Sequence, residues 1–173
     1  MAQRLFFALR PDAAATADII AVQQQLPADK LRIYSAENLH QTLAFLGQFA
    51  DCQLMELISA CQSIDLPPFS MQFEQLNYWP QPKVLCLLAQ DIPDELMALV
   101  AVLKEIAGQF NVTLDQRPYR PHITLARKAS ETITLDFAPI SFTADEFVLM
   151  QSQSTDNGPI YKPLYCWPLT AVG

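Results

Sequence analysis

Apolar positions recur along the chain with two different periods, which divide it into strands and helices. Residues 3–9 form a short apolar and aromatic run that is typical of a buried strand. Between 91 and 108 the apolar positions are three and four residues apart, which predicts an amphipathic helix that ends at Gly108. By the same reasoning we expect strands at 3–9, 40–46, 69–79, 84–89, 122–126 and 160–168, a long strand within 138–150, and a short strand or a connection at 31–34. We expect helices at 11–26, 51–66 and 91–108.

The order of these elements indicates a mixed α and β fold. Strands follow one another directly at several points, and a turn at Pro80–Pro82 joins two of them as a hairpin. A single parallel sheet is therefore not expected, because each of its strands would need a long crossover connection. The polar residues 151–159 predict a loop. No low-complexity tract or linker divides the chain, so we expect residues 1–173 to form one domain.

Composition restricts the class of protein. Hydrophobic residues make up 51% of the chain, so a packed core is expected and disorder is not. No apolar run approaches the roughly 18 residues that a membrane-spanning helix needs. The first ten residues also lack the features of a signal peptide. These observations predict a soluble, cytoplasmic protein with no membrane partner.

The distribution of charge matters more than its sum. A net charge of −7 argues against general binding of nucleic acid, which depends on neutralising phosphates. Residues 116–130, however, contain no acidic side chain, whereas Arg117, Arg120, Arg127 and Lys128 all lie there. A local cationic site on an acidic body suits a small anion or an RNA end better than a long duplex.

The cysteines do not suggest a metal site. Cys52, Cys61, Cys86 and Cys166 include no C-x-x-C pair, and the chain has only two histidines. We therefore expect reduced thiols that pack as small apolar side chains, and neither a metal nor another cofactor.

The strongest feature is a repeated motif that contains both histidines of the chain. The sequence His-Gln-Thr-Leu begins at His40, and His-Ile-Thr-Leu begins at His122. Residues two apart on a strand point to the same face, so His40 is expected to project with Thr42, and His122 with Thr124. If the two strands pair about a local two-fold axis, two imidazoles and two hydroxyls converge on one cavity.

Such a pair of histidines suits in-line displacement at phosphorus. The unperturbed pKa of histidine lies near neutrality, so one ring can hold a proton while the other accepts one. One imidazole then removes a proton from the nucleophile, and the other protonates the leaving oxygen. The threonine hydroxyls can donate to the phosphoryl oxygens. A single His-x-Thr is more often structural, but the doubled motif beside a basic segment favours catalysis, and the scheme requires no metal.

Two arginines beside the second motif are candidate phosphate contacts. Arg120 lies two residues before His122, so on a strand the two side chains would point to the same face, although Pro121 could bend the chain between them. Arg127 lies five residues after His122 and has the opposite parity. A phosphate contact and an exposed strand end remain equally open for Arg127.

Aromatic residues near the motifs are candidates for stacking on an RNA base. Tyr119 and Phe45 are the residues that we assign to this role, although core packing is the favoured alternative for Phe45. We expect Trp79 and Trp167 to be packing residues.

The motifs resemble those of the 2H phosphoesterases, a superfamily named for two His-x-Thr/Ser-x motifs. Within it the chain looks most like the bacterial RNA 2′,3′-cyclic phosphodiesterases, also known as 2′–5′ RNA ligases of the LigT or ThpR type. The resemblance covers nearly the whole chain and rests on residues 4–9, 38–47, 117–127 and 161–169. It implies a bilobal α+β fold, with two pseudo-two-fold-related lobes of antiparallel sheet and outer helices around a central cleft.

The resemblance also implies an activity, which is hydrolysis of a terminal 2′,3′-cyclic phosphate of RNA to a 2′-phosphate, with weaker, reversible 2′–5′ ligation. By analogy, His40 would protonate the departing 3′ oxygen and His122 would activate water, an order that the symmetric sequence does not fix. The expected partner is an RNA end or nucleotide that bears this cyclic phosphate, and the expected state is a monomer. Two alternatives stay open: a phosphodiesterase for small cyclic nucleotides, and a non-catalytic 2H domain that binds RNA or nucleotides.

Overall fold

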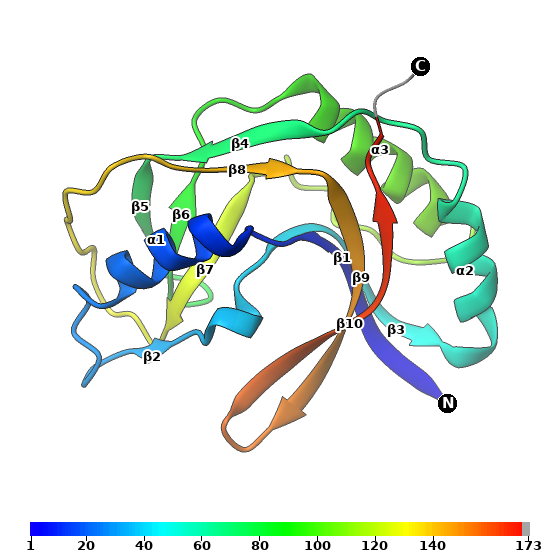
Figure 1. The fold of residues 1–173 in the computed structure, drawn as a ribbon. Coiled ribbons are helices and arrows are strands. Elements are labelled where there is room, and N and C mark those ends of the chain that lie inside the picture. Colours follow the sequence, from blue (N-terminus) through cyan, green and yellow to red (C-terminus); the bar gives the residue numbers. More distant parts are fainter. Residues whose placement is uncertain (171–173) are drawn as a thin grey trace.

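Strands and helices follow one another in a mixed order over residues 1–170, the part of the chain that the computed structural model describes (Figure 1). The expected α+β class is confirmed. Within this part of the chain, no helix is both long and apolar enough to cross a membrane. The elements are β1 (Ala2–Leu9), α1 (Ala13–Gln23), β2 (Arg32–Ile33), the 3₁₀ helix η1 (Ala36–Asn38), β3 (Gln41–Ala50), the 3₁₀ helix η2 (Asp51–Gln53), α2 (Leu54–Cys61), β4 (Phe69–Phe73), β5 (Gln75–Trp79), β6 (Val84–Leu88), α3 (Asp94–Gly108), β7 (His122–Arg127), β8 (Ile140–Ala144), β9 (Glu146–Thr155) and β10 (Gly158–Pro168).

The strands form one large sheet and one small sheet, and every pairing is antiparallel. The large sheet has the order β10-β9-β1-β3-β7-β6-β5, with β2 beside β7, and the small sheet is β4-β8. Strands β3 and β7 pair through only one register position, at which Gln41 lies opposite Ile123. This short junction divides the large sheet into two halves, and each half contributes one motif strand to the junction. The bilobal arrangement expected from the sequence is confirmed.

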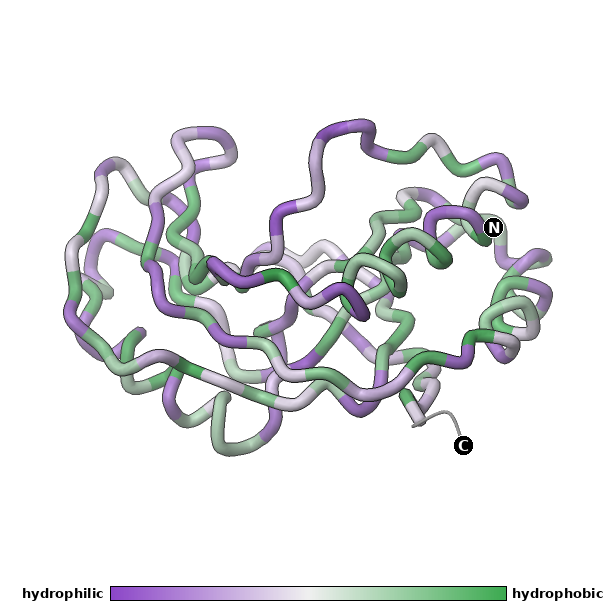
Figure 2. Tube along the Cα trace, turned by 90° about the horizontal axis from the view of Figure 1, so that it is seen from above, coloured by the Kyte–Doolittle hydropathy of each residue, from purple (hydrophilic) through white to green (hydrophobic). Residues whose placement is uncertain are grey.

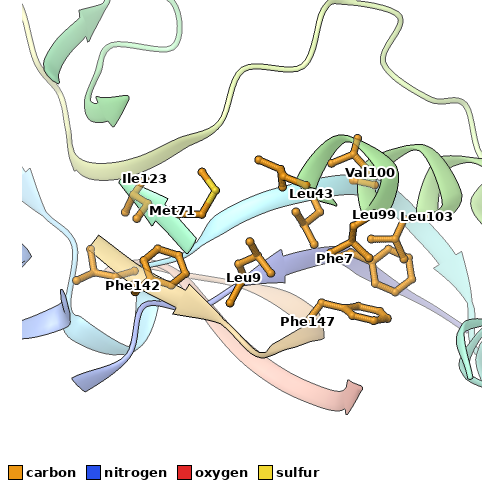
Figure 3. Packing of buried hydrophobic residues seen from close by; sticks show 14 of the residues in the cluster. Phe7, Leu9, Leu43, Met71, Leu99, Val100, Leu103, Ile123, Phe142 and Phe147 are labelled. Atoms are coloured by element: carbon orange, nitrogen blue, oxygen red, sulfur yellow. The ribbon is translucent and has the colours of Figure 1, made fainter. Parts of the chain in front are cut away.

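Helix α3 covers the half of the sheet that contains β3. Leu99, Val100 and Leu103 of α3 pack over Leu43 of β3 and Phe7 of β1 (Figure 3). These five side chains are at most 2% exposed. Burial of each side chain of this size contributes about 1.5–3 kcal/mol, so the contact holds the first motif strand firmly in place.

Helix α1 begins at Ala13, two residues after the predicted start at 11. The carboxylate of Asp12 accepts a hydrogen bond from the backbone N–H of Ala15 at 2.8 Å, which caps the first turn. The helix packs against β8 of the small sheet, whose Phe142 is buried together with Met71 of β4 (Figure 3). Hydrophobic and hydrophilic positions alternate along much of the chain (Figure 2), as expected for strands with one buried face.

Two stretches that we expected to be single strands are each two strands. The stretch 69–79 breaks at Glu74, and the stretch 138–150 breaks at Asp145. At each break the chain passes from the small sheet to the large sheet. A break of one residue hardly disturbs the alternation of apolar positions, so the sequence pattern does not reveal a change of sheet.

The prediction of a loop at 151–159 is wrong. This stretch contains the end of β9 and the start of β10, which form a hairpin that extends from the body of the protein (Figure 1). Only residues 156 and 157 separate the two strands. Because the hairpin tip does not cover the core, its strands carry polar residues on both faces, and the alternation that identifies a half-buried strand is lost.

Candidate active site

Both histidines lie where the two halves of the large sheet meet. His40 immediately precedes β3, and His122 is the first residue of β7. The Nδ1 atom of His40 bonds the carbonyl oxygen of Asn38 at 2.7 Å, and that of His122 bonds the carbonyl oxygen of Arg120 at 2.8 Å. A carbonyl can only accept, so Nδ1 carries the hydrogen in both rings. Each neutral ring therefore presents an unprotonated Nε2, and the two Nδ1 atoms are held in the same way.

The two threonines are partly buried on the same strand faces as the histidines. In β7, His122 and Thr124 are partly exposed, whereas Ile123 between them is buried. In the first motif, the hydroxyl of Thr42 lies 3.2 Å from Nε2 of His40. Because Nδ1 of this ring carries the hydrogen, the hydroxyl donates to Nε2. The expectation that each His-x-Thr pair shares a face is confirmed.

A β-bulge follows each motif and changes which residues share its face. In β3 the pairing with β1 skips Leu43, and in β7 the pairing with β6 skips Leu125. A bulge adds one residue to one strand and so inverts the parity of the residues beyond it. As a result, Phe45 and Arg127, each five residues after its motif histidine, lie on the side of the motif rather than on the core side.

Phe45 is therefore not a core residue. Its side chain is 43% exposed, which contradicts the core packing that we favoured for it. The guanidinium of Arg4 lies over its ring, 5.0 Å from the centroid. Because Phe45 lines cavity space, it remains a candidate for stacking on a base.

Arg127 lies inside a polar cavity of about 420 Å³, which we call the His40 cavity because His40 and Thr42 also line it. Its Nε donates to the hydroxyl of Tyr34 at 2.6 Å, which holds the guanidinium at the cavity wall. Of the two alternatives left open for Arg127, the position inside the cavity favours the phosphate contact.

Tyr161 of β10 is a wall of the same cavity that sequence reasoning missed. Its ring meets the ring of His40 edge-on, with centroids 4.8 Å apart, and its hydroxyl lies 3.4 Å from that of Tyr34. Burial raises the pKa of Tyr161, so its hydroxyl stays protonated and can donate a hydrogen bond. The sequence contains no local signal for this contact, because Tyr161 lies in the final strand.

Asn38 joins this hairpin to the first histidine. Its side-chain amide donates to the carbonyl oxygen of Pro159 at 2.8 Å and accepts from the backbone N–H of Tyr161 at 3.1 Å. Its own carbonyl oxygen is the acceptor for His40 Nδ1. A shift of the hairpin would therefore move the group that orients the His40 ring.

His122 borders a second cavity, of about 730 Å³, which we call the His122 cavity. Trp79 lies against His122, with ring centroids 4.6 Å apart, and the guanidinium of Arg120 lies 4.9 Å from the centroid of the Trp79 ring. Trp79 is partly buried and packs against these two side chains at the edge of the cavity rather than in the core. The expectation that Trp167 is a packing residue is confirmed: it is 5% exposed and stacks on Phe147.

Tyr119 also lines the His122 cavity, but its hydroxyl is already occupied. It donates to the backbone carbonyl of Thr42 at 2.8 Å and accepts from the side-chain amide of Gln41 at 3.0 Å. These bonds tie the segment before β7 to β3 across the junction of the two half-sheets. The ring of Tyr119, rather than its hydroxyl, is thus the part that faces the cavity.

The surroundings favour neutral histidines when no ligand is bound. Burial lowers the pKa of His40 to about 4; the hydrogen bond to Asn38 opposes this shift, whereas the charges of His122 and Arg127 add to it. Burial also lowers the pKa of His122, and the charge of Arg120 acts in the same direction. A bound anion would favour the charged form of both rings. Within residues 1–170, no three histidine, cysteine or acidic side chains lie close enough together to hold a metal ion.

Comparisons with known proteins agree with this geometry. The family model of the 2′-5′ RNA ligase superfamily matches residues 10–156. The chain is 33% identical to the RNA 2′,3′-cyclic phosphodiesterase of Escherichia coli (strain K12), with 97% of each protein covered, and 32% identical to that of Thermotoga maritima, with 76% of this chain and 75% of that protein covered.

The same relationship holds in three dimensions. The crystal structure of E. coli LigT in apo form superposes on the chain with a TM-score of 0.88 at 32% identity, over 98% of this chain and 99% of LigT. LigT complexed with 3′-AMP superposes with a TM-score of 0.89 at the same identity, over 99% of this chain and 100% of LigT. With its doubled motif, its two half-sheets and a family match over most of its length, the chain belongs to the 2′-5′ RNA ligase superfamily.

Proposed function

We propose that the protein hydrolyses the terminal 2′,3′-cyclic phosphate of RNA to a 2′-phosphate, with His40 and His122 as the acid and the base. The observation that carries this proposal is the matched presentation of the two rings: each Nδ1 is held by a backbone carbonyl, which leaves each Nε2 available for proton transfer. The relatives named RNA 2′,3′-cyclic phosphodiesterase supply the substrate class.

In the proposed reaction, the phosphate lies between the two imidazoles. His122 removes a proton from water as the water attacks phosphorus, and His40 protonates the 3′ oxygen as its bond to phosphorus breaks. Thr42 and Thr124 donate to the phosphoryl oxygens, and Arg127 offsets their charge. In the ligand-free site the pKa of His40 is low. His40 can donate a proton only if the bound anionic substrate raises the pKa of the His40 ring.

The test is incubation of the purified protein, with EDTA, on a short RNA that ends in a 2′,3′-cyclic phosphate. We expect a 2′-phosphate end, and a loss of turnover of about 10²–10⁴-fold in His40→Ala and in His122→Ala, as is typical of removing a general acid or base. Thr42→Ala and Thr124→Ala should lose less, because a hydroxyl supplies only part of the anion stabilisation. A urea unfolding curve for each variant serves as the control for folding.

The same panel decides between the alternatives. Hydrolysis of small 2′,3′-cyclic nucleotides but not of the RNA would favour a small-molecule phosphodiesterase. Binding of the RNA without turnover by the wild-type protein would indicate a non-catalytic domain. A 3′-phosphate product would contradict the assignment of the 3′ oxygen as the leaving group. We further propose that the protein is cytoplasmic and that residues 1–173 form one domain. We also propose that it is a monomer, which sedimentation at micromolar concentration tests.

A further inference from the structure

More positive charge surrounds the His40 cavity than a cyclic phosphate requires. Arg4 and Arg127 line the cavity, and Arg32 of β2 lies directly opposite Arg127 in the pairing of β2 with β7. Among residues 1–170, no acidic side chain lines this cavity, and none of the three arginines forms an ion pair. A terminal 2′,3′-cyclic phosphate carries a single negative charge, so it leaves part of this positive charge without a counter-ion.

The strand pairing places the side chains of Arg32 and Arg127 next to each other. Residues directly opposite on antiparallel strands project to the same face, with their Cβ atoms about 4.5–5.5 Å apart. Because Arg127 projects into the His40 cavity, Arg32 projects on the cavity side as well. Like charges in such a pair are destabilising, and an anion bound beside them would remove this cost.

The hairpin of β9 and β10 holds Arg32 at the rim of the cavity. Gly158, the first residue of β10, lines the cavity and has a φ of +109°, a conformation that favours glycine. A Cβ atom at this position would lie only 3.0 Å from Cζ of Arg32 and 3.2 Å from its Nε. The guanidinium of Arg32 therefore occupies the space that a side chain at 158 would need, and it contacts a wall of the cavity.

The polar groups around this contact suit a phosphate. Ser154 of β9 also lines the His40 cavity, and its hydroxyl can donate to an anion. The acidic residue closest in sequence to Gly158 is Asp156, in the turn of the hairpin, and it forms no ion pair with Arg32 in the part of the chain that the structure describes. The guanidinium of Arg32 is thus available to a ligand.

The direction of the substrate follows from the proposed function, on which this inference rests. His40 protonates the 3′ oxygen, so the ribose that carries this oxygen lies in the His40 cavity. Arg127 contacts the cyclic phosphate, and Phe45, with the guanidinium of Arg4 over its ring, takes the base. Arg32 is then the one cation of the three that no group of this nucleotide contacts.

We infer that Arg32 and Ser154 form a second phosphate site, which binds the phosphate on the 5′ oxygen of the terminal nucleoside. In RNA this group is the phosphodiester that joins the last two nucleotides. The site distinguishes an RNA end from a free nucleoside 2′,3′-cyclic phosphate, whose 5′ oxygen carries no phosphate. The reaction at the cyclic phosphate is the same in both cases.

Three substrates isolate the contribution of this phosphate. They are adenosine 2′,3′-cyclic phosphate, the same nucleotide with an added 5′-phosphate, and the dinucleotide ApA with a 2′,3′-cyclic phosphate end. Wild type should prefer the second and the third over the first by about 10-fold in kcat/KM, as is typical of one charged contact to phosphate. Arg32→Gln should lose this preference, because glutamine keeps a polar side chain but not the charge.

Two further variants serve as matched controls. Arg127→Gln should lower kcat/KM for all three substrates and keep the preference, because Arg127 contacts the phosphate that they share. Lys30→Gln removes an exposed cation two residues before Arg32 that forms no ion pair within residues 1–170. It changes the net charge as Arg32→Gln does, and it should keep the preference.

Three outcomes would overturn the inference. If Arg32→Gln slows all three substrates equally, Arg32 supports the hairpin and does not bind a phosphate. If Arg4→Gln loses the preference and Arg32→Gln keeps it, the second phosphate lies at Arg4. If wild type prefers the dinucleotide but not the nucleotide with a 5′-phosphate, the protein recognises the second nucleoside rather than the phosphate.

Binding of product analogues tests the second site without turnover. Adenosine 2′,5′-bisphosphate and adenosine 2′-phosphate differ only in the 5′-phosphate, and isothermal titration calorimetry measures the affinity of each. Wild type should bind the bisphosphate about 10-fold more tightly, and Arg32→Gln should bind both with similar affinity. Equal affinities in wild type would overturn the inference. A wild-type protein that shows the difference in affinity but hydrolyses none of the three substrates would contradict the proposed function instead.

Discussion

Protonation of His40 is expected to couple the stability of the fold to pH. An unfolded chain binds the proton with a pKa near 6.5, whereas burial lowers the pKa of His40 in the folded protein to about 4. Between these two values the unfolded state binds more protons than the folded state. Stability is therefore fully present above pH 6.5 and is lost progressively as the pH falls toward 4.

The size of the effect follows from the two pKa values. Protonation of His40 changes the free energy of unfolding negligibly at pH 7 and lowers it by about 2 kcal/mol at pH 5. In His40→Gln this dependence is removed, because glutamine does not titrate. Wild type should thus lose about 2 kcal/mol more stability than His40→Gln between pH 7 and pH 5, measured by urea unfolding at each pH. The titration of His122 is present in both proteins and largely cancels.

Equal losses of stability in the two proteins would refute the reasoning. They would mean that His40 titrates near its ordinary pKa, and therefore that the site is open to water in solution. NMR of ¹⁵N-labelled histidine gives a direct check, because the chain has only two histidines. Both rings should carry their hydrogen on Nδ1 at pH 7, and the signals of His40 should titrate near pH 4.

The remaining predictions concern catalysis. Asn38→Asp keeps the acceptor but loses the donor to Pro159, so kcat should fall by roughly 10-fold; an unchanged kcat would show that the hairpin does not orient His40. Arg127→Gln should raise KM for the cyclic phosphate RNA by about 10-fold, because a charged contact to phosphate is lost; a KM equal to that of wild type would place Arg127 outside the phosphate site. Because the pKa values of both His40 and His122 are lowered, kcat/KM should decline above pH 6.5 as the singly protonated free protein disappears, and a rate that rises to pH 8 would contradict this. Activity should survive dialysis against EDTA, and inhibition reversed by one metal would refute the metal-free mechanism.

Much of the chemistry is determined locally. The His-x-Thr spacing places each imidazole beside its hydroxyl because the side-chain period of a strand is two, and Thr42 bonds His40 as this period requires. The repetition of the motif predicted the local two-fold relation, which the pairing of Gln41 with Ile123 bears out. These features depend on neighbours in sequence, so the sequence alone was sufficient to identify them.

The alternation of side chains along a strand gave the wrong face for residues that lie beyond a β-bulge. A bulge is set by how two strands register against each other, and the skipped residues, Leu43 and Leu125, look like ordinary strand leucines. Sequence reasoning therefore assigned Phe45 to the core and left Arg127 undecided, although both lie on the motif side of their strands. Only the paired strands show this, because parity beyond a bulge depends on the partner.

What the sequence determined by itself was the pair of histidines, their hydroxyl neighbours and the α+β class. The motifs follow from residue spacing within one strand, and the class follows from the order of the elements along the chain. What the tertiary structure decided was the surroundings of each ring. Tyr161, whose backbone N–H bonds Asn38 across 123 positions of sequence, closes on His40, and Trp79 from β5 lies against His122. Contacts between distant elements depend on how the whole sheet twists and closes, so no local pattern encodes them.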